Sequence, residues 1–296
     1  MMNEQLLQAI MGAPSERTVV GRFAPSPTGR MHLGNVYAAL MSYLSVRSRG
    51  GWWIVRMEDI DTQRSRREYA EQLLDDLRWL GLQPDGEVEY QSDRYHIYNV
   101  YLQQLSAAGL VYPCSCTRAE IMASAPHQSD GHVVYSGRCR PAQPRFDAHL
   151  LPQTLRLRVD AGVTEEFADD LCGLQRVDVA GEFGDFALRR RDGMWAYQFA
   201  VAVDDALMGV TEVVRGDDLL LSTAPQRYIQ RLLNLPQPER YVHLPLLRNA
   251  AGQRLSKRDG SLSLEALRPT HSAEAVLAQV LAAADLPTTL LQAITR

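Results

Sequence analysis

The sequence predicts an α/β protein built on a parallel sheet, and three observations lead to this prediction. Of the 296 residues, 46% are hydrophobic, which is enough to bury one substantial core and an insertion. Residues 18–23 form a short apolar run, and a loop with two prolines leads from it into a helical pattern at 34–49. A second apolar run follows at 52–57. A strand, a helix and a strand in this order demand parallel pairing, with a ligand at the carboxyl ends of the strands.

The later elements continue this pattern after an interruption. Two more helices are predicted, at about 64–80 and 93–109. Residues 113–185 hold paired cysteines, prolines and short strand-like pieces, which indicates an inserted α+β subdomain. The α/β pattern then resumes and ends with a helix from Pro225 and a strand near 241–246.

These patterns divide the chain into five segments. We expect a flexible extension at 1–17, the two halves of a Rossmann-like domain at 18–112 and 186–250, the inserted subdomain at 113–185, and a loop with a short helical tail at 251–296.

Charge and composition exclude several classes of protein. The net charge is −4, so any contact with RNA must come from local arginine clusters such as 189–191. No apolar run is long enough to span a bilayer, and the first residues lack the features of a signal peptide. We therefore expect a cytoplasmic protein with no membrane partner. In that compartment the four cysteines stay reduced, which favours a metal site or buried thiols over disulfides.

One lysine differs from all the other basic residues. Of the 31 basic side chains 30 are arginine, and the exception is Lys257, in the polar stretch 253–260. A lysine carries a compact charge on a flexible stem, which can follow a phosphate as its geometry changes during a reaction. The alternative is an ordinary surface lysine. The Leu-Ser-Lys loop around it favours contact with a nucleotide phosphate.

A second pattern places a histidine at the start of a helix. The loop at 24–29 leads to His32, Leu33, Gly34 and Asn35, on the first turn of the predicted helix. Free backbone N–H groups and the positive end of the helix dipole suit a phosphate there, and Gly34 allows a nucleotide to come close. His32 can donate a hydrogen bond, although ordinary helix capping is the alternative reading.

With these motifs the chain resembles the class I aminoacyl-tRNA synthetases, and the glutamate subgroup fits best. Residues 22–29 (RFAPSPTG) and 32–35 (HLGN) are similar to the HIGH-type motif, and 254–258 (RLSKR) is similar to the KMSKS-type motif. The sequence departs from the family at two positions, since Asn35 replaces the usual second histidine and Arg254 replaces the first lysine of the phosphate loop.

The resemblance implies a site for L-glutamate and ATP, with Mg²⁺ accompanying ATP. Glutamate carries two carboxylates and one ammonium group, and Arg22, Arg215 and Glu58 supply two cations and one anion for it. Which arginine meets which carboxylate stays open. The other residues expected at the amino acid are Phe23, Ala24, Pro25, Ser26 and Tyr197. The residues expected at ATP are His32, Gly34, Asn35 and Lys257, of which His32 and Lys257 are the expected catalytic residues.

The implied reaction is attack of the glutamate α-carboxylate on the α-phosphorus of ATP, followed by transfer of glutamate to a hydroxyl group of an RNA. Only 39 residues follow Lys257, so we expect no anticodon-binding domain. This shortening is similar to that of the glutamyl-Q tRNA(Asp) synthetases, which transfer glutamate to the queuosine base of tRNA(Asp). The expected protein is a monomeric, ligase-type enzyme.

The cysteines of the insert predict a structural zinc site. Cys114, Cys116 and Cys139 supply three thiolates, and a fourth donor would complete a tetrahedron. By resemblance to the glutamyl-Q group that donor is Tyr135, whereas His127 and His132 are chemically easier alternatives. We expect one zinc ion per chain. Cys172 is expected to be a packing residue instead.

Three other functions fit parts of the sequence. A shortened glutamyl-tRNA synthetase that charges tRNA(Glu) would share the same motifs. A small-molecule adenylyltransferase would need neither the Arg22, Glu58 and Arg215 set nor the separate Lys257 loop. A non-catalytic RNA-binding relative would be expected to have lost His32 or Lys257.

Overall fold

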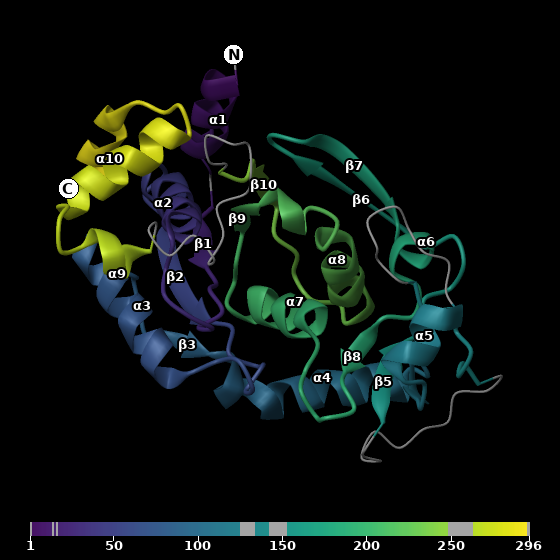
Figure 1. Cartoon of the computed structure of the whole chain (residues 1–296). Coiled ribbons are helices and arrows are strands. Elements are labelled where there is room, and N and C mark those ends of the chain that lie inside the picture. The colour runs from purple at the N-terminus through teal and green to yellow at the C-terminus, as the bar shows by residue number, and fades with distance from the viewer. Residues whose placement is uncertain are drawn as a thin grey trace.

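The chain folds around a five-stranded parallel sheet (Figure 1). This computed structural model describes residues 2–13, 15, 17–124, 134–141, 153–247 and 263–294. The strand order is β10-β9-β1-β2-β3. The strands are β1 (Val20–Phe23), β2 (Trp52–Met57), β3 (Glu89–Tyr90), β9 (Glu212–Gly216) and β10 (Arg240–Leu244). The predicted strand–helix–strand unit is confirmed, because β1 and β2 pair in parallel from Val20 with Trp52 to Phe23 with Val55.

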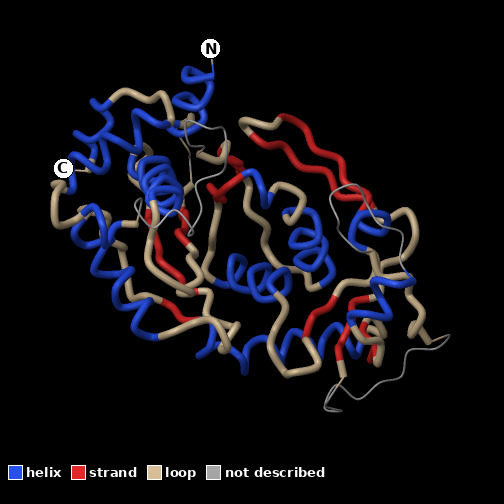
Figure 2. The backbone as a smooth tube through the Cα atoms, in the orientation of Figure 1, coloured by secondary structure: helices blue, strands red, loops and turns tan. Residues whose placement is uncertain are grey.

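Helices surround this sheet, as the backbone trace shows (Figure 2). The first half of the chain supplies α1 (Met2–Met11), α2 (Leu33–Arg47), α3 (Arg67–Trp79), the 3-10 turn η1 (Gln91–Arg94) and α4 (Tyr95–Ala107). The second half supplies α7 (Tyr197–Leu207), η2 (Asp217–Leu219), α8 (Thr223–Leu232), α9 (Leu264–Leu267), α10 (Ala273–Ala283) and η4 (Thr288–Ala293). Among the described helices, none is long and apolar enough to cross a bilayer.

Close packing of α2 on β1 explains a glycine inside a strand. A Cβ atom at Gly21 would lie 2.5 Å from a methyl carbon of Val46, closer than packed carbon atoms approach. Glycine therefore lets α2 lie directly on the sheet, which brings the start of that helix to the carboxyl end of β1.

The N-terminal segment is ordered, so the expectation that residues 1–17 fray is wrong for Met2–Met11. Within α1, Leu6, Ala9 and Ile10 are buried in the main core. Arg240 donates a hydrogen bond to the carbonyl of Ala9. The apolar residues recur at helical spacing over too few turns to be recognised, and their burial depends on contacts with distant elements.

The insert contains two small sheets. Its elements are β4 (Val111–Cys114), α5 (Arg118–Ser124), β5 (Thr154–Leu157), the hairpin β6 (Thr164–Asp169) and β7 (Gly173–Asp178), α6 (Val179–Phe183) and β8 (Ala187–Arg189). Strands β4, β5 and β8 form one antiparallel sheet. Because β8 pairs with β5, the insert extends beyond the boundary expected at 185.

Replacing Ile10 with alanine tests whether α1 is part of the core. Ile10 is fully buried, so we expect Ile10→Ala to lower the free energy of unfolding by about 2–4 kcal/mol. Urea denaturation of the variant and its parent measures this difference. The matched control is Gln8→Ala on the exposed face of α1, which should change stability by less than about 0.5 kcal/mol. Equal stability of Ile10→Ala and the control would contradict the packing of α1.

Candidate active site

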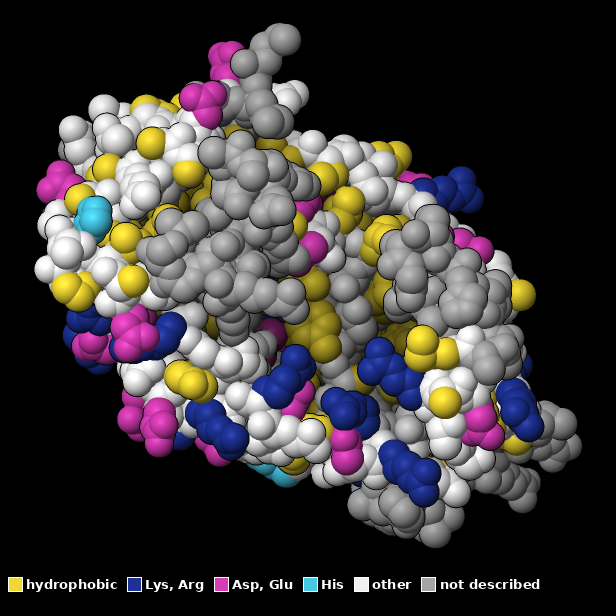
Figure 3. All heavy atoms as spheres, viewed as in Figure 1, with side chains coloured by type: hydrophobic (Ala, Val, Ile, Leu, Met, Phe, Trp, Pro, Cys, Tyr) yellow, Lys and Arg dark blue, Asp and Glu magenta, His cyan; other side chains and the backbone are white. Residues whose placement is uncertain are grey.

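A cavity of about 510 Å³ opens where β1, β9 and β10 end. It lies at the carboxyl ends of parallel strands, where a ligand is expected. The molecule is hollowed at the centre of the face in Figure 3, and arginine side chains lie below the hollow. Lining residues that were also predicted from the sequence are Arg22, Phe23, Ala24, Pro25, Ser26, His32, Gly34, Asn35, Glu58, Tyr197 and Arg215.

One end of this cavity is the first turn of α2. His32 is the N-cap residue, and its Nδ1 accepts the backbone N–H of Gly34 at 3.0 Å. The side chain of Asn35 in turn accepts the backbone N–H of His32 at 3.3 Å, which completes a capping box. Since Nδ1 is an acceptor, the proton of the neutral imidazole lies on Nε2. Capping and hydrogen-bond donation are therefore compatible in one histidine.

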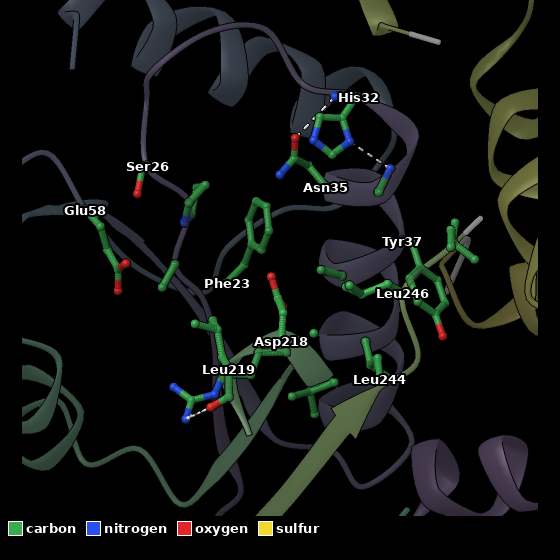
Figure 4. A pocket seen from close by; sticks show the side chains of 18 of the residues that line it. Phe23, Ser26, His32, Asn35, Tyr37, Glu58, Asp218, Leu219, Leu244 and Leu246 are labelled. Carbon is green, nitrogen blue, oxygen red and sulfur yellow. Dashed lines mark hydrogen bonds between the residues drawn. The ribbon is translucent and has the colours of Figure 1, made fainter. Parts of the chain in front are cut away.

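The other end of the cavity is charged. Figure 4 shows Glu58 and Ser26 across the cavity from His32 and Asn35. Glu58 is 8% exposed, and one of its oxygens accepts a hydrogen bond from Arg56 at 3.2 Å. Burial raises the pKa of Glu58, and the charges of Arg56 and Arg22 oppose that rise.

A buried pair of cations holds this end in place. The Nε of Arg22 lies 3.3 Å from Asp205, and Arg56 donates to the same carboxylate at 2.7 Å. Asp204 lies 3.8 Å from Arg56 and also accepts from Arg94 at 2.8 Å. Although burial disfavours its charge, Arg22 and Arg56 lower the pKa of Asp205. Arg56 and Glu58 are both buried, so their ion pair belongs to the interior and not to the surface.

The two predicted arginines of the cavity differ in how many of their N–H groups remain for a ligand. Arg215 donates through all three nitrogens, to His243, Gln226, Thr223 and the carbonyl of Leu219. Arg22 donates only through Nε within the described part of the chain. Both terminal nitrogens of Arg22 thus remain for a ligand, whereas Arg215 is largely fixed by the protein.

Lys257 lies outside the described residues, but the chain on both sides of it is fixed at the cavity. Leu247, the last described residue before it, lines the cavity. Ser263, the first described residue after it, pairs with His32 as an isolated bridge, and Leu264 donates to the carbonyl of Met31 at 2.9 Å.

The three cysteines predicted to bind zinc lie close together. The sulfur atoms of Cys114, Cys116 and Cys139 all lie within 4.8 Å of one another. The phenol oxygen of Tyr135 lies 3.3 Å from the sulfur of Cys114 and 3.7 Å from that of Cys116. Thiolates around one tetrahedral zinc ion lie about 3.8 Å apart, so these donors fit zinc. His127 and His132 lie outside the described residues.

The structure adds site residues that sequence reasoning missed. Asp205 has no role that the sequence alone indicates, and only its contacts with Arg22 and Arg56 reveal one. His243 showed no sequence signal, since its importance comes from contact with Arg215. Cys172, expected to pack inside, is exposed in the turn between β6 and β7.

Comparisons with known proteins agree with this geometry. Residues 18–284 match the family described as class I tRNA synthetases (E and Q), catalytic domain. A glutamyl-Q tRNA(Asp) synthetase of Neisseria meningitidis serogroup C is 47% identical over 90% of this chain and 88% of that protein. One of Geobacter sulfurreducens is 48% identical over 84% and 79%.

A solved structure shares the fold as well. The glutamate tRNA ligase of Elizabethkingia meningosepticum, determined in complex with its amino acid, superposes with a TM-score of 0.68 at 32% identity. The match covers 83% of this chain and 53% of the ligase, so the chain spans about half of that structure.

Replacing Asp205 with asparagine tests the buried charge cluster. The substitution removes a negative charge that compensates Arg22 and Arg56. We therefore expect Asp205→Asn to lower the free energy of unfolding by about 3 kcal/mol at pH 7. The folded-state pKa of Asp205 lies below its ordinary 3.8, so its contribution is full above that value and is lost as the pH falls through the folded pKa. Urea denaturation of the variant and its parent at both pH values should therefore show a smaller difference in the free energy of unfolding at pH 3 than at pH 7.

The control for this variant is Glu71→Gln, which removes an exposed pair with Arg67 in which both side chains are 67% exposed. Its effect should stay below about 0.5 kcal/mol. An Asp205→Asn variant as stable as this control would show that the cluster does not need its central carboxylate.

Proposed function

The chain belongs to the class I tRNA synthetases of the glutamate and glutamine group, and from this membership we propose that it activates L-glutamate with ATP and transfers it to the queuosine base in the anticodon of tRNA(Asp). One observation carries the proposal. A single cavity joins the His32 turn of α2 to Arg22, Glu58 and Arg215, so nucleotide and amino acid have adjoining places. The names of the relatives from Neisseria and Geobacter support tRNA(Asp) as the acceptor of glutamate.

The charged end of the cavity suits glutamate. The two terminal nitrogens of Arg22, which have no hydrogen-bond partner among the described residues, form a planar fork that can hold a carboxylate through two hydrogen bonds. Within the described residues, only one oxygen of Glu58 accepts a hydrogen bond, which leaves the other for the ammonium group. Arg215 and Tyr197 line the same space and can meet the second carboxylate.

The His32 end suits the phosphates of ATP. The Nε2–H of His32 and the N-terminus of α2 provide donors for phosphate oxygens, with Gly34 and Asn35 beside them. In the proposed reaction an α-carboxylate oxygen attacks the α-phosphorus, the bond to pyrophosphate breaks, and glutamyl-adenylate forms. Charge that develops on the phosphate oxygens is stabilised by His32 and Lys257. Mg²⁺ would accompany ATP and neutralise its phosphates.

The role proposed for Lys257 rests on the resemblance of 254–258 to the KMSKS-type motif. The described residues on either side of this stretch support it, because Leu247 lines the cavity and Ser263 is bridged to His32.

A second cavity provides a place for the acceptor. It measures about 480 Å³ and shares Ser26, Glu58 and Tyr197 with the first cavity. Arg190 and Trp195 also line it, and the exposed Arg190 offers a cation to a base. A hydroxyl of the modified base could attack the carbonyl carbon of glutamyl-adenylate from this side, which forms an ester to the base and releases AMP. Charging of tRNA(Glu) is the less favoured alternative, because the curated relatives compared above carry the glutamyl-Q name.

Zinc would be held in the insert by Cys114, Cys116, Cys139 and Tyr135. With Tyr135 as the fourth donor the site would be closed, so the ion would stabilise the fold of the insert and leave no open position for chemistry.

Transfer of labelled glutamate to purified tRNA tests the acceptor. We expect label on tRNA(Asp) that carries queuosine and none on tRNA(Asp) without it, because the hydroxyl that reacts belongs to the modified base. We also expect glutamate-dependent exchange of pyrophosphate into ATP in the absence of RNA. Label on both forms of tRNA(Asp), or only on tRNA(Glu), would contradict the proposed acceptor.

Metal analysis of the purified chain tests the zinc site. We expect about one zinc ion per chain, and loss of most of it in Cys116→Ser, with a lower melting temperature. Cys172→Ser is the matched control, since Cys172 is exposed and lies outside the cluster, and it should retain the metal. Metal-free parent protein, or equal zinc content in both variants, would rule out this site.

A further inference from the structure

A buried imidazole lies behind Arg215. His243, on β10, is 1% exposed and does not line the cavity. Its Nε2 accepts the Nε–H of Arg215 at 3.1 Å. Its Nδ1 lies 2.6 Å from a carboxylate oxygen of Asp169, at the end of β6. The three side chains thus form one line from the insert, through the edge strand of the sheet, to the wall of the glutamate pocket.

The charges along this line determine the form of the histidine. Arg215 is always a donor, so Nε2 must offer its lone pair and the ring proton must be on Nδ1, where it is donated to Asp169. Burial lowers the pKa of His243 against the effect of Asp169, which keeps the ring neutral. Burial opposes the charge of Asp169, but hydrogen bonds from His243 and the backbone of Cys172 lower its pKa, so it stays ionised.

The insert is firmly attached at this point. Asp169 also accepts the backbone N–H of His243 at 3.1 Å, and Asp170 donates its own N–H to the carbonyl of Tyr241 at 3.0 Å. The side chain of Asp170 accepts from Arg240 at 2.7 Å. Figure 1 shows the far end of the β6–β7 hairpin beside β10. The hairpin tip is therefore held to β10 by backbone and side-chain bonds together.

His243 has a role that the other partners of Arg215 do not share. Thr223 and Gln226, both on α8, accept from the terminal nitrogens of Arg215. Among the described residues, His243 is the acceptor for its Nε–H. Fixing Nε together with the terminal nitrogens sets the plane of the guanidinium, which a carboxylate ligand must match.

We propose that His243 is a positioning residue for glutamate. Asp169 accepts the Nδ1 proton of His243, and His243 in turn orients Arg215. The tip of the inserted hairpin therefore contributes to the geometry of the amino-acid pocket. This inference rests on the proposed function, because it takes Arg215 to contact glutamate.

Pyrophosphate exchange, with glutamate and ATP varied separately, tests the proposal. His243→Leu removes the acceptor, so we expect the KM for glutamate to rise about tenfold while the KM for ATP changes less than about twofold. His243→Gln keeps an acceptor near Nε2 and should recover most of the affinity. Asp169→Asn should also raise the KM for glutamate, and combining it with His243→Leu should add little, because both changes break one line of contacts.

The matched control is Gln230→Leu on α8, which removes a buried side chain that donates a hydrogen bond to the carbonyl of Ala202 instead of contacting Arg215. It should leave the KM for glutamate unchanged. An unchanged KM for glutamate in His243→Leu, an equal rise in both KM values, or no recovery in a folded His243→Gln would overturn the proposal. A parent enzyme without glutamate-dependent exchange would instead overturn the proposed function, and this inference with it.

Discussion

The pocket depends on the neutralisation of the buried positive charge of Arg56. The side chain of Arg56 is fully buried, and a lone guanidinium there would cost several kcal/mol. Asp204, Asp205 and Glu58 surround it, and together they raise its pKa against the effect of burial. Glu58, directly after β2, lines the cavity, whereas Asp204 and Asp205 lie on α7 and are buried outside its lining. Balancing one internal charge therefore also places the anion and, through Asp205, the Arg22 fork that a charged amino acid requires.

Much of this arrangement could be predicted because it is local. The segment from β1 to the start of α2 contains Arg22, Ser26 and His32 in one short stretch, and its proline and glycine pattern can be recognised without tertiary contacts. Parallel pairing of β1 with β2 follows from the helix between them. The cysteine cluster was equally accessible, since Cys114 and Cys116 are two residues apart.

What could not be predicted depends on pairs far apart in the chain. Asp169 and His243 are separated by 74 positions, and neither has a neighbour in sequence that indicates a role. Burial of Ile10 depends on α2 and β10. Pairing of β8 with β5 moves the edge of the insert beyond the change in composition near 185. The position of Lys257 is untested, because it lies outside the described residues.

The contacts that flank the stretch 248–262 have a mechanical consequence. Leu247 lines the cavity, and Ser263 is bridged to His32 at the start of α2. Leu264 also donates to the carbonyl of Met31, so the C-terminal helices are attached to the same turn that caps α2. A substitution that loosens this attachment would therefore disturb the phosphate end of the cavity even though the C-terminal helices lie outside it.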